Sequence, residues 1–130
     1  MRLSALAFVV ASFGLASLPA LAEDGCKNPK TPYDRTYCVA KLFLESDNEL
    51  NAVYKELKGA LKKDGKDKLT QVQRDWIAYR DQKCSTNGDI EVQCNFDLNK
   101  ARADYLRDRA RECKTGHCQD DLIGKKSWEG

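Results

Sequence analysis

The chain contains 130 residues, with 22 lysine or arginine and 20 aspartate or glutamate side chains and a formal net charge of +2. This balance excludes the strongly basic surface that is typical of nucleic-acid-binding proteins and of polybasic membrane contacts. Charged residues make up 32% of the chain, so we expect one small domain with a densely charged surface.

The first 22 residues have the pattern of a secretory signal peptide. Arg2 precedes an apolar run from residue 3 to residue 18, and Pro19-Ala20-Leu21-Ala22 supplies small residues before a cleavage site. We therefore expect residues 1–22 to be removed after Ala22 and the mature protein to be periplasmic or secreted.

The sequence after this segment predicts no membrane attachment. No later apolar run approaches the ~20 residues that a membrane span needs. Glu23-Asp24-Gly25 precede Cys26, and they differ from the small apolar residues that precede a lipid-modified cysteine. We expect no lipid anchor.

Six cysteines follow the predicted cleavage site: Cys26, Cys38, Cys84, Cys94, Cys113 and Cys118. An even number of cysteines in a small exported chain is typical of a disulfide framework, here of three bridges. The sequence does not choose among the possible pairings. We favour pairing in sequence order, as Cys26–Cys38, Cys84–Cys94 and Cys113–Cys118, because short loops close at a small cost in chain entropy.

The rest of the chain favours helices. After Pro29 and Pro32 it contains no proline and is rich in good helix formers, and continuous period-2 alternation is absent. We expect an all-α fold, a small disulfide-stapled bundle of three to four helices in which short connections make neighbouring helices antiparallel. The helical domain is expected over residues 23–113, and a short mobile tail over residues 114–130.

The first predicted helix begins at Thr31-Pro32, where Thr31 can cap the helix and Pro32 suits its first position. Ser46-Asp47-Asn48-Glu49 is a second capping pattern, so this segment either contains two helices or continues as one bent helix. Asp64-Gly65 is expected to end it. Further helices are expected over residues 67–83 and 90–112, separated by the polar segment 85–89.

One face of the helix predicted over residues 67–83 combines apolar and polar residues: Gln73, Trp76, Ile77, Arg80 and Cys84. Buried polar side chains need partners, because an unpaired group costs about 1–3 kcal/mol. We expect Asn51 to partner Gln73, and a carboxylate or carbonyl group to partner Arg80. The predicted structural core includes Tyr54, Gln73, Trp76 and Arg80. The alternative is a binding surface rich in arginine and aromatic residues.

The last predicted helix carries charges of alternating sign over residues 102–112. Pairs of opposite charge three residues apart are typical of a solvated helix face. A basic strip for an acidic partner is the alternative.

Residues suited to catalysis or metal binding are few. His117 is the only histidine, so a Ser-His-Asp or Cys-His site lacks its parts. His117 with Cys113 and Cys118 offers three metal ligands at most, and no C-x-x-C redox motif is present. Two carboxylates suffice for a glycosidase, and 20 acidic residues leave that alternative open. We expect a protein that is not an enzyme and holds neither a metal nor a cofactor.

The segment between Cys84 and Cys94 is the best candidate for recognition. If these two cysteines are joined, residues 85–93 form a constrained polar loop, which loses little conformational freedom on binding. The predicted partner-binding residues in it are Asn87, Gly88, Asp89 and Glu91.

A family resemblance rests on the motif Gln73-x-x-Trp76-x-x-Tyr79-Arg80-Asp81-x-x-Cys84 and on residues around it: Cys26, Cys38, Leu50, Asn51, Tyr54, Cys94, Arg102 and Leu106. With these residues the chain resembles the LprI-type lysozyme-inhibitor family of exported bacterial proteins, over about residues 26–107. The resemblance implies a helical, disulfide-bonded domain of the bacterial envelope that binds a lysozyme and blocks its active cleft. The family supplies no catalytic residues to carry over.

Two other functions stay open at this point. One is an envelope interaction module with a different protein partner, and the other is an enzyme that acts on cell-wall glycan. Steering toward a cationic lysozyme favours an acidic inhibitor. In this nearly neutral chain, Asp89 and Glu91 would have to supply the complementary charge.

Overall fold

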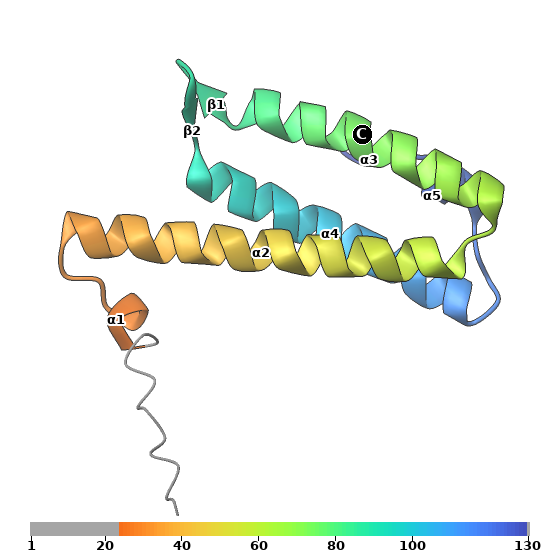
Figure 1. Ribbon diagram of the computed structural model, residues 1–130, viewed down its shortest axis with the longest axis horizontal. Helices are drawn as coiled ribbons and strands as arrows, with labels where there is room; N and C mark the ends of the chain where they lie inside the picture. Colours follow the sequence, from red (N-terminus) through yellow and green to blue (C-terminus); the bar gives the residue numbers. More distant parts are fainter. Residues whose placement is uncertain (1–23, 130) are drawn as a thin grey trace, which may run out of the picture.

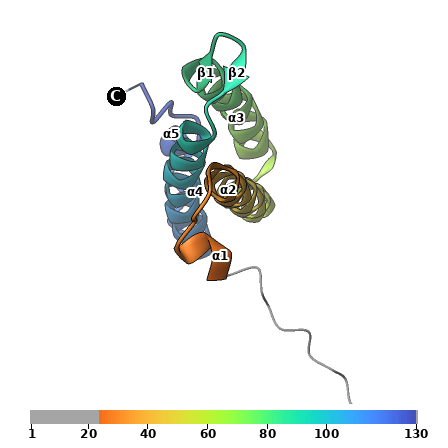
Figure 2. The same cartoon turned by 90° about the vertical axis from the view of Figure 1, so that its left-hand side faces the viewer.

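The computed structural model describes residues 24–129, so the predicted signal peptide and its cleavage site lie outside the described residues. Three long helices make up most of the described part: α2 (Pro32–Ala60), α3 (Lys63–Lys83) and α4 (Val92–Lys114). Consecutive long helices run in opposite directions and lie side by side (Figures 1 and 2). Two short helices, α1 (Asp24–Lys27) and α5 (Asp120–Ile123), and a two-stranded hairpin complete the structure.

The predicted all-α, disulfide-bonded bundle is confirmed. The three disulfides join the cysteines in sequence order, as Cys26–Cys38, Cys84–Cys94 and Cys113–Cys118. Among the helices in residues 24–129, none is both long and apolar enough to cross a bilayer.

Helix α2 begins at Pro32, as expected from the sequence, and a capping box closes its first turn. The Asp34 backbone N–H donates to Thr31 Oγ1 at 3.0 Å, and the Thr31 backbone N–H donates to Asp34 Oδ2 at 3.0 Å. Ser46 does not start a second helix, because α2 continues through it to Ala60, and its hydroxyl donates to the Phe43 carbonyl oxygen at 2.7 Å. Of the two alternatives for this segment, the structure therefore has one continuous helix.

Helix α3 begins earlier than expected. The sequence predicts a stop at Asp64-Gly65, but both residues lie in the first turn of α3, which starts at Lys63. A carboxylate suits this position because the N-terminus of a helix carries partial positive charge. A Cβ atom at Gly65 would lie 3.3 Å from Leu61 Cβ and Cδ2, so glycine lets the α2–α3 turn pack closely.

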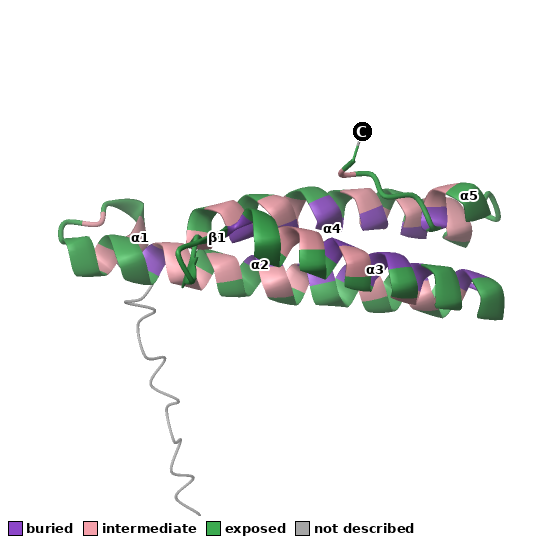
Figure 3. Ribbon diagram, turned by 90° about the horizontal axis from the view of Figure 1, so that it is seen from above, coloured by how far each residue is buried: buried purple, intermediate pink, exposed green. Residues whose placement is uncertain are grey.

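The apolar core lies where the three long helices face one another (Figure 3). Its members come from α2, α3 and α4, with one residue from the α2–α3 turn and one from α5: Leu50, Val53, Leu57, Leu61, Leu69, Val72, Trp76, Ala103, Leu106, Ala110 and Ile123. Burial of these side chains supplies the main stabilisation of a small domain.

The C-terminal tail packs against the bundle, and its expected mobility stays a prediction. Ile123 is 1% exposed in the core, and the Tyr105 hydroxyl donates to the Leu122 carbonyl oxygen at 2.7 Å. Trp128 packs on Tyr79 with 6.0 Å between ring centroids. These contacts have no signature in local sequence periodicity, because each is made with a distant helix.

Ion pairs join α2 to α4. Lys100 donates to the Glu49 carboxylate at 2.7 Å, and Arg107 donates to its other oxygen. Glu56 on α2 likewise accepts a hydrogen bond from Lys114 on α4. The hydrogen bond from Lys100, supported by Arg107, holds the pKa of Glu49 below its ordinary value of 4.5.

This lowered pKa predicts a pH-dependent contribution to stability. The unfolded chain binds a proton at Glu49 more readily than the folded chain, so the contribution is present above about pH 4.5 and is lost as the pH falls through the lowered pKa. We expect Glu49→Gln to be less stable than the unsubstituted protein at pH 7, and the difference to shrink toward pH 3. Urea unfolding at both pH values measures this.

Glu45→Gln is the matched control, because the ion-pair partner of Glu45 is Lys41 on the same helix. It should show a smaller difference at pH 7. A stability gap for Glu49→Gln that stays constant from pH 7 to pH 3 would contradict the assignment.

Candidate functional site

The segment between Cys84 and Cys94 contains a β-hairpin, where the sequence predicts only a loop. Strand β1 (Ser85–Thr86) pairs antiparallel with β2 (Asp89–Ile90). Asn87 has φ 54° and Gly88 has φ 88°, which is the left-handed backbone of a type I′ turn and favours Asn-Gly. The Glu91 backbone N–H donates to the Cys84 carbonyl oxygen at 2.8 Å. The Asn-Gly pair is the sequence signal that could have predicted this hairpin.

The hairpin projects from one end of the bundle (Figures 1 and 2). We define it as residues 85–91, all of which are exposed. The structure thus gathers the four predicted partner-binding residues on one protrusion. Its tip, around Asn87 and Gly88, is neutral, while Asp89 and Glu91 carry carboxylates that form no ion pair within residues 24–129.

A shallow hollow lies beside the hairpin. It has a volume of about 360 Å³ and is lined by Phe43, Arg80, Asp81, Ser85, Ile90 and Asn95. Ile90 itself is 68% exposed. The N-terminal half of α2 exposes Tyr33, Tyr37 and Leu44, which the sequence pattern alone does not separate from core residues.

A polar network behind the hairpin holds its base. Arg80 donates to Asp81 at 2.8 Å and to Asp47 at 3.4 Å, which are the carboxylate partners expected for it. It also donates to Asn99 Oδ1 at 3.1 Å, and Asn99 donates to Ser46 Oγ at 3.3 Å. This network ties the end of α3 to α2 and α4.

The partner expected for Gln73 is wrong. Gln73 Oε1 accepts from Arg102 Nε at 3.1 Å, whereas Asn51 is exposed and donates to Asp47 at 3.2 Å. Arg102 is 2% exposed, so it does not belong to a solvated face as expected. Tyr54 is half-buried, and its hydroxyl lies 3.3 Å from Thr70 Oγ1.

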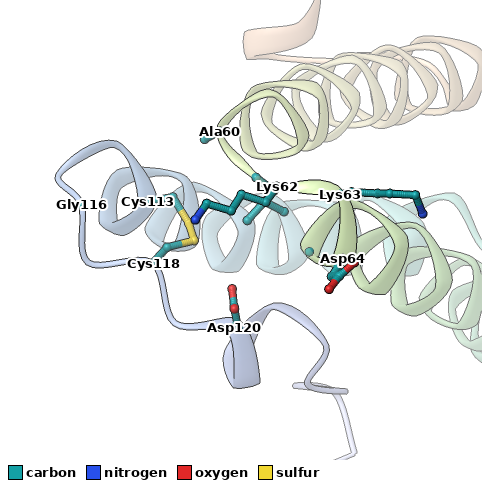
Figure 4. Close-up of a pocket in the computed structure, with 10 residues that line it drawn as sticks. Ala60, Lys62, Lys63, Asp64, Cys113, Gly116, Cys118 and Asp120 are labelled. Carbon is teal, nitrogen blue, oxygen red and sulfur yellow. A yellow bond between two sulfur atoms is a disulfide. The ribbon is translucent and has the colours of Figure 1, made fainter.

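A second hollow, of about 580 Å³, lies at the opposite end, between the α2–α3 turn and the Cys113–Cys118 disulfide. Figure 4 shows the Lys62 side chain extending toward this disulfide; Asp64 and Asp120 also line the hollow. Charges of both signs line this hollow without forming a defined site. No group of three or more His, Cys, Asp or Glu side chains placed to hold a metal occurs in the described part of the chain.

Together these features define a small, disulfide-bonded helical domain that presents a preorganised polar hairpin. The family model described as lysozyme inhibitor LprI matches residues 26–117, and the chain belongs to this family. The match spans all three long helices and the hairpin, which confirms the family resemblance noted in the sequence. No curated protein and no solved structure matches the chain.

Proposed function

We propose that this protein is an exported lysozyme inhibitor that acts by binding, without catalysis, and that its hairpin enters the active cleft of the lysozyme. The observation that carries the proposal is a fully exposed hairpin, closed by a disulfide, in a member of the LprI family. Three disulfides suit an oxidising compartment, which supports export to the periplasm or beyond by way of residues 1–22. We also propose that Cys26 is not modified by a lipid anchor.

The chemistry of the hairpin tip suits the cleft of a glycosidase. Such enzymes place two carboxyl groups across the scissile bond, and carboxylates accept hydrogen bonds. The tip offers the Asn87 amide, the Thr86 hydroxyl and backbone N–H groups without adding a negative charge. Because the turn and the Cys84–Cys94 disulfide fix the backbone, the hairpin loses little freedom on binding.

The base of the hairpin suits the rim of a cationic enzyme. Asp89 and Glu91 lie on the strand that returns from the tip, and they are free to pair with lysine or arginine of a partner. Rim charges act mainly on the association rate and lose their effect at high salt.

A lysis assay on cell walls tests the proposal with charge variants. We expect Asp89→Asn/Glu91→Gln to weaken inhibition of a cationic lysozyme by ~10-fold at low salt, because the electrostatic attraction at the rim is lost. Asn87→Gly keeps the left-handed turn, since glycine adopts a positive φ freely, and removes only the amide. It should weaken inhibition at all salt concentrations.

Asp64→Asn/Asp121→Asn is the matched control, because it removes the same charge from the exposed surface near the other end of α3. It should inhibit as the unsubstituted protein does. Absence of inhibition by the unsubstituted protein at micromolar excess over several lysozymes would overturn the proposal, and equal effects of both double variants would remove the hairpin from it.

A further inference from the structure

Arg102 is a buried cation without a counter-ion. Its side chain is 2% exposed, and Nε donates to Gln73 while Nη1 lies 3.4 Å from Ser127 Oγ. Nη2 is buried and has no hydrogen-bond partner. Within residues 24–129, no carboxylate lies within ion-pair distance of this guanidinium.

Aromatic rings surround this guanidinium. Its Cζ lies 5.4 Å from the centroid of Tyr105 and 5.1 Å from that of Trp128. A hollow of about 360 Å³ opens over it, lined chiefly by Trp76, Tyr79, Leu98, Tyr105, Ser127 and Trp128. We call this space the aromatic hollow; it shares no residue with the hairpin.

The energetics of Arg102 favour an anion in this place. Desolvation lowers the pKa of Arg102 to about 10, so the side chain is charged at neutral pH and lacks full compensation for the water it has lost. Cation–π contacts offset part of this cost. A carboxylate facing Nη2 would offset the rest, because carboxylate and guanidinium match in geometry.

The C-terminal tail covers the aromatic hollow with Ser127 and Trp128, which line it. Trp128 packs against Tyr79, and Lys126 lies 3.6 Å from Asp75 across partly exposed surface. The residues on either side of Trp128 are exposed. The Trp128 indole therefore occupies a place that fits a flat ring, between Tyr79 and the Arg102 guanidinium.

We propose that the aromatic hollow binds a small carboxylate that carries a flat ring. Its carboxylate pairs with Nη2 of Arg102, and its ring takes the place of the Trp128 indole beside Tyr79 and Tyr105. The Trp128 indole of the tail then competes with the ligand for the same space, and the ligand displaces it. This site is separate from the lysozyme-binding hairpin, and its test needs no lysozyme.

Tryptophan fluorescence tests the site directly, because both tryptophans of the chain, Trp76 and Trp128, line the aromatic hollow. We expect phenylacetate to change the emission of the full protein with a Kd of about 1 mM or tighter. Phenylacetamide, which has the same shape but no charge, should bind at least ~10-fold more weakly. The same titration with N-acetylphenylalanine and its amide tests the carboxyl end of a peptide as the ligand. Comparison of its affinity with that of phenylacetate distinguishes a peptide end from a small free acid.

Three variants locate the binding. Trp128→Ala should tighten phenylacetate binding by ~3-fold or more, because the internal competitor is removed; Trp76 still reports on the hollow. Arg102→Gln should abolish the preference for the acid over the amide. Arg109→Gln is the matched control, since Arg109 also lies over Tyr105, at 5.0 Å, but pairs with Glu112; it should bind as the unsubstituted protein does.

Equal binding of phenylacetate and phenylacetamide, or no binding of either at 20-fold above the expected Kd, would overturn the proposal. So would unchanged affinity in Trp128→Ala. If Arg102→Gln does not fold, these two comparisons decide the question without it.

Discussion

Replacing Trp76 by alanine is expected to unfold much of the population at moderate temperature. Trp76 is 2% exposed in the core, and the Arg80 guanidinium lies 5.3 Å from its ring centroid. Truncation of a buried tryptophan leaves a cavity and costs about 3–5 kcal/mol. For a domain of this size we expect the Tm to fall by ~12 °C or more. Circular dichroism at 222 nm, followed during heating, measures the change.

Ile77→Ala is the matched control on the next residue of α3. The sequence pattern places both residues on the inward face, but Ile77 is 40% exposed, so this expectation is corrected. Its truncation should cost less than ~1 kcal/mol. Similar Tm losses for Trp76→Ala and Ile77→Ala would contradict the packing of α3 against α2 and α4.

Removing the Cys84–Cys94 disulfide is expected to affect both stability and inhibition. The two cysteines are 10 residues apart, and closure of such a loop contributes about 3 kcal/mol by the chain-entropy model. In Cys84→Ala/Cys94→Ala the hairpin loses its covalent closure, so it must be ordered again on binding. We expect a lower midpoint in urea and, at a temperature where the variant is folded, weaker inhibition in the lysis assay.

Cys113→Ala/Cys118→Ala tests whether that effect is specific to the hairpin. This disulfide closes a shorter loop, of sequence separation 5, at the other end of the bundle. We expect a loss of about 2 kcal/mol and unchanged inhibition. An equal loss of inhibition in both cysteine variants would show that inhibition follows general stability and not the hairpin.

Features set by neighbouring residues could be predicted from the sequence. The start of α2 follows from Pro32 at its first position and from Thr31 and Asp34, whose side chains each accept from the other's backbone N–H. The disulfides join successive cysteines along the chain, as expected because short loops close at a small cost in chain entropy. The hairpin could also have been predicted, because Asn87-Gly88 between two short strands is a local turn signal. The predicted loop covers the same segment but does not include its strand pairing.

Features set by distant residues could not be predicted in this way. The pairing of Gln73 with Arg102 depends on how α3 and α4 face each other. Local spacing does not show this, so the partner expected for Gln73, Asn51 on α2, was wrong. Alternating charge made Arg102 resemble its solvated neighbours. The tail shows the same limit, because Ile123 and Trp128 carry no periodic pattern and pack only where the bundle offers them a surface.

The role of the hairpin is tested most directly by a titration of the ¹⁵N-labelled protein with an unlabelled cationic lysozyme that it inhibits, followed by amide chemical shifts. We expect the largest changes on residues 85–91 and their neighbours at the base of the hairpin. The largest changes on Tyr33, Tyr37 and Leu44, with an unaffected hairpin, would contradict this role.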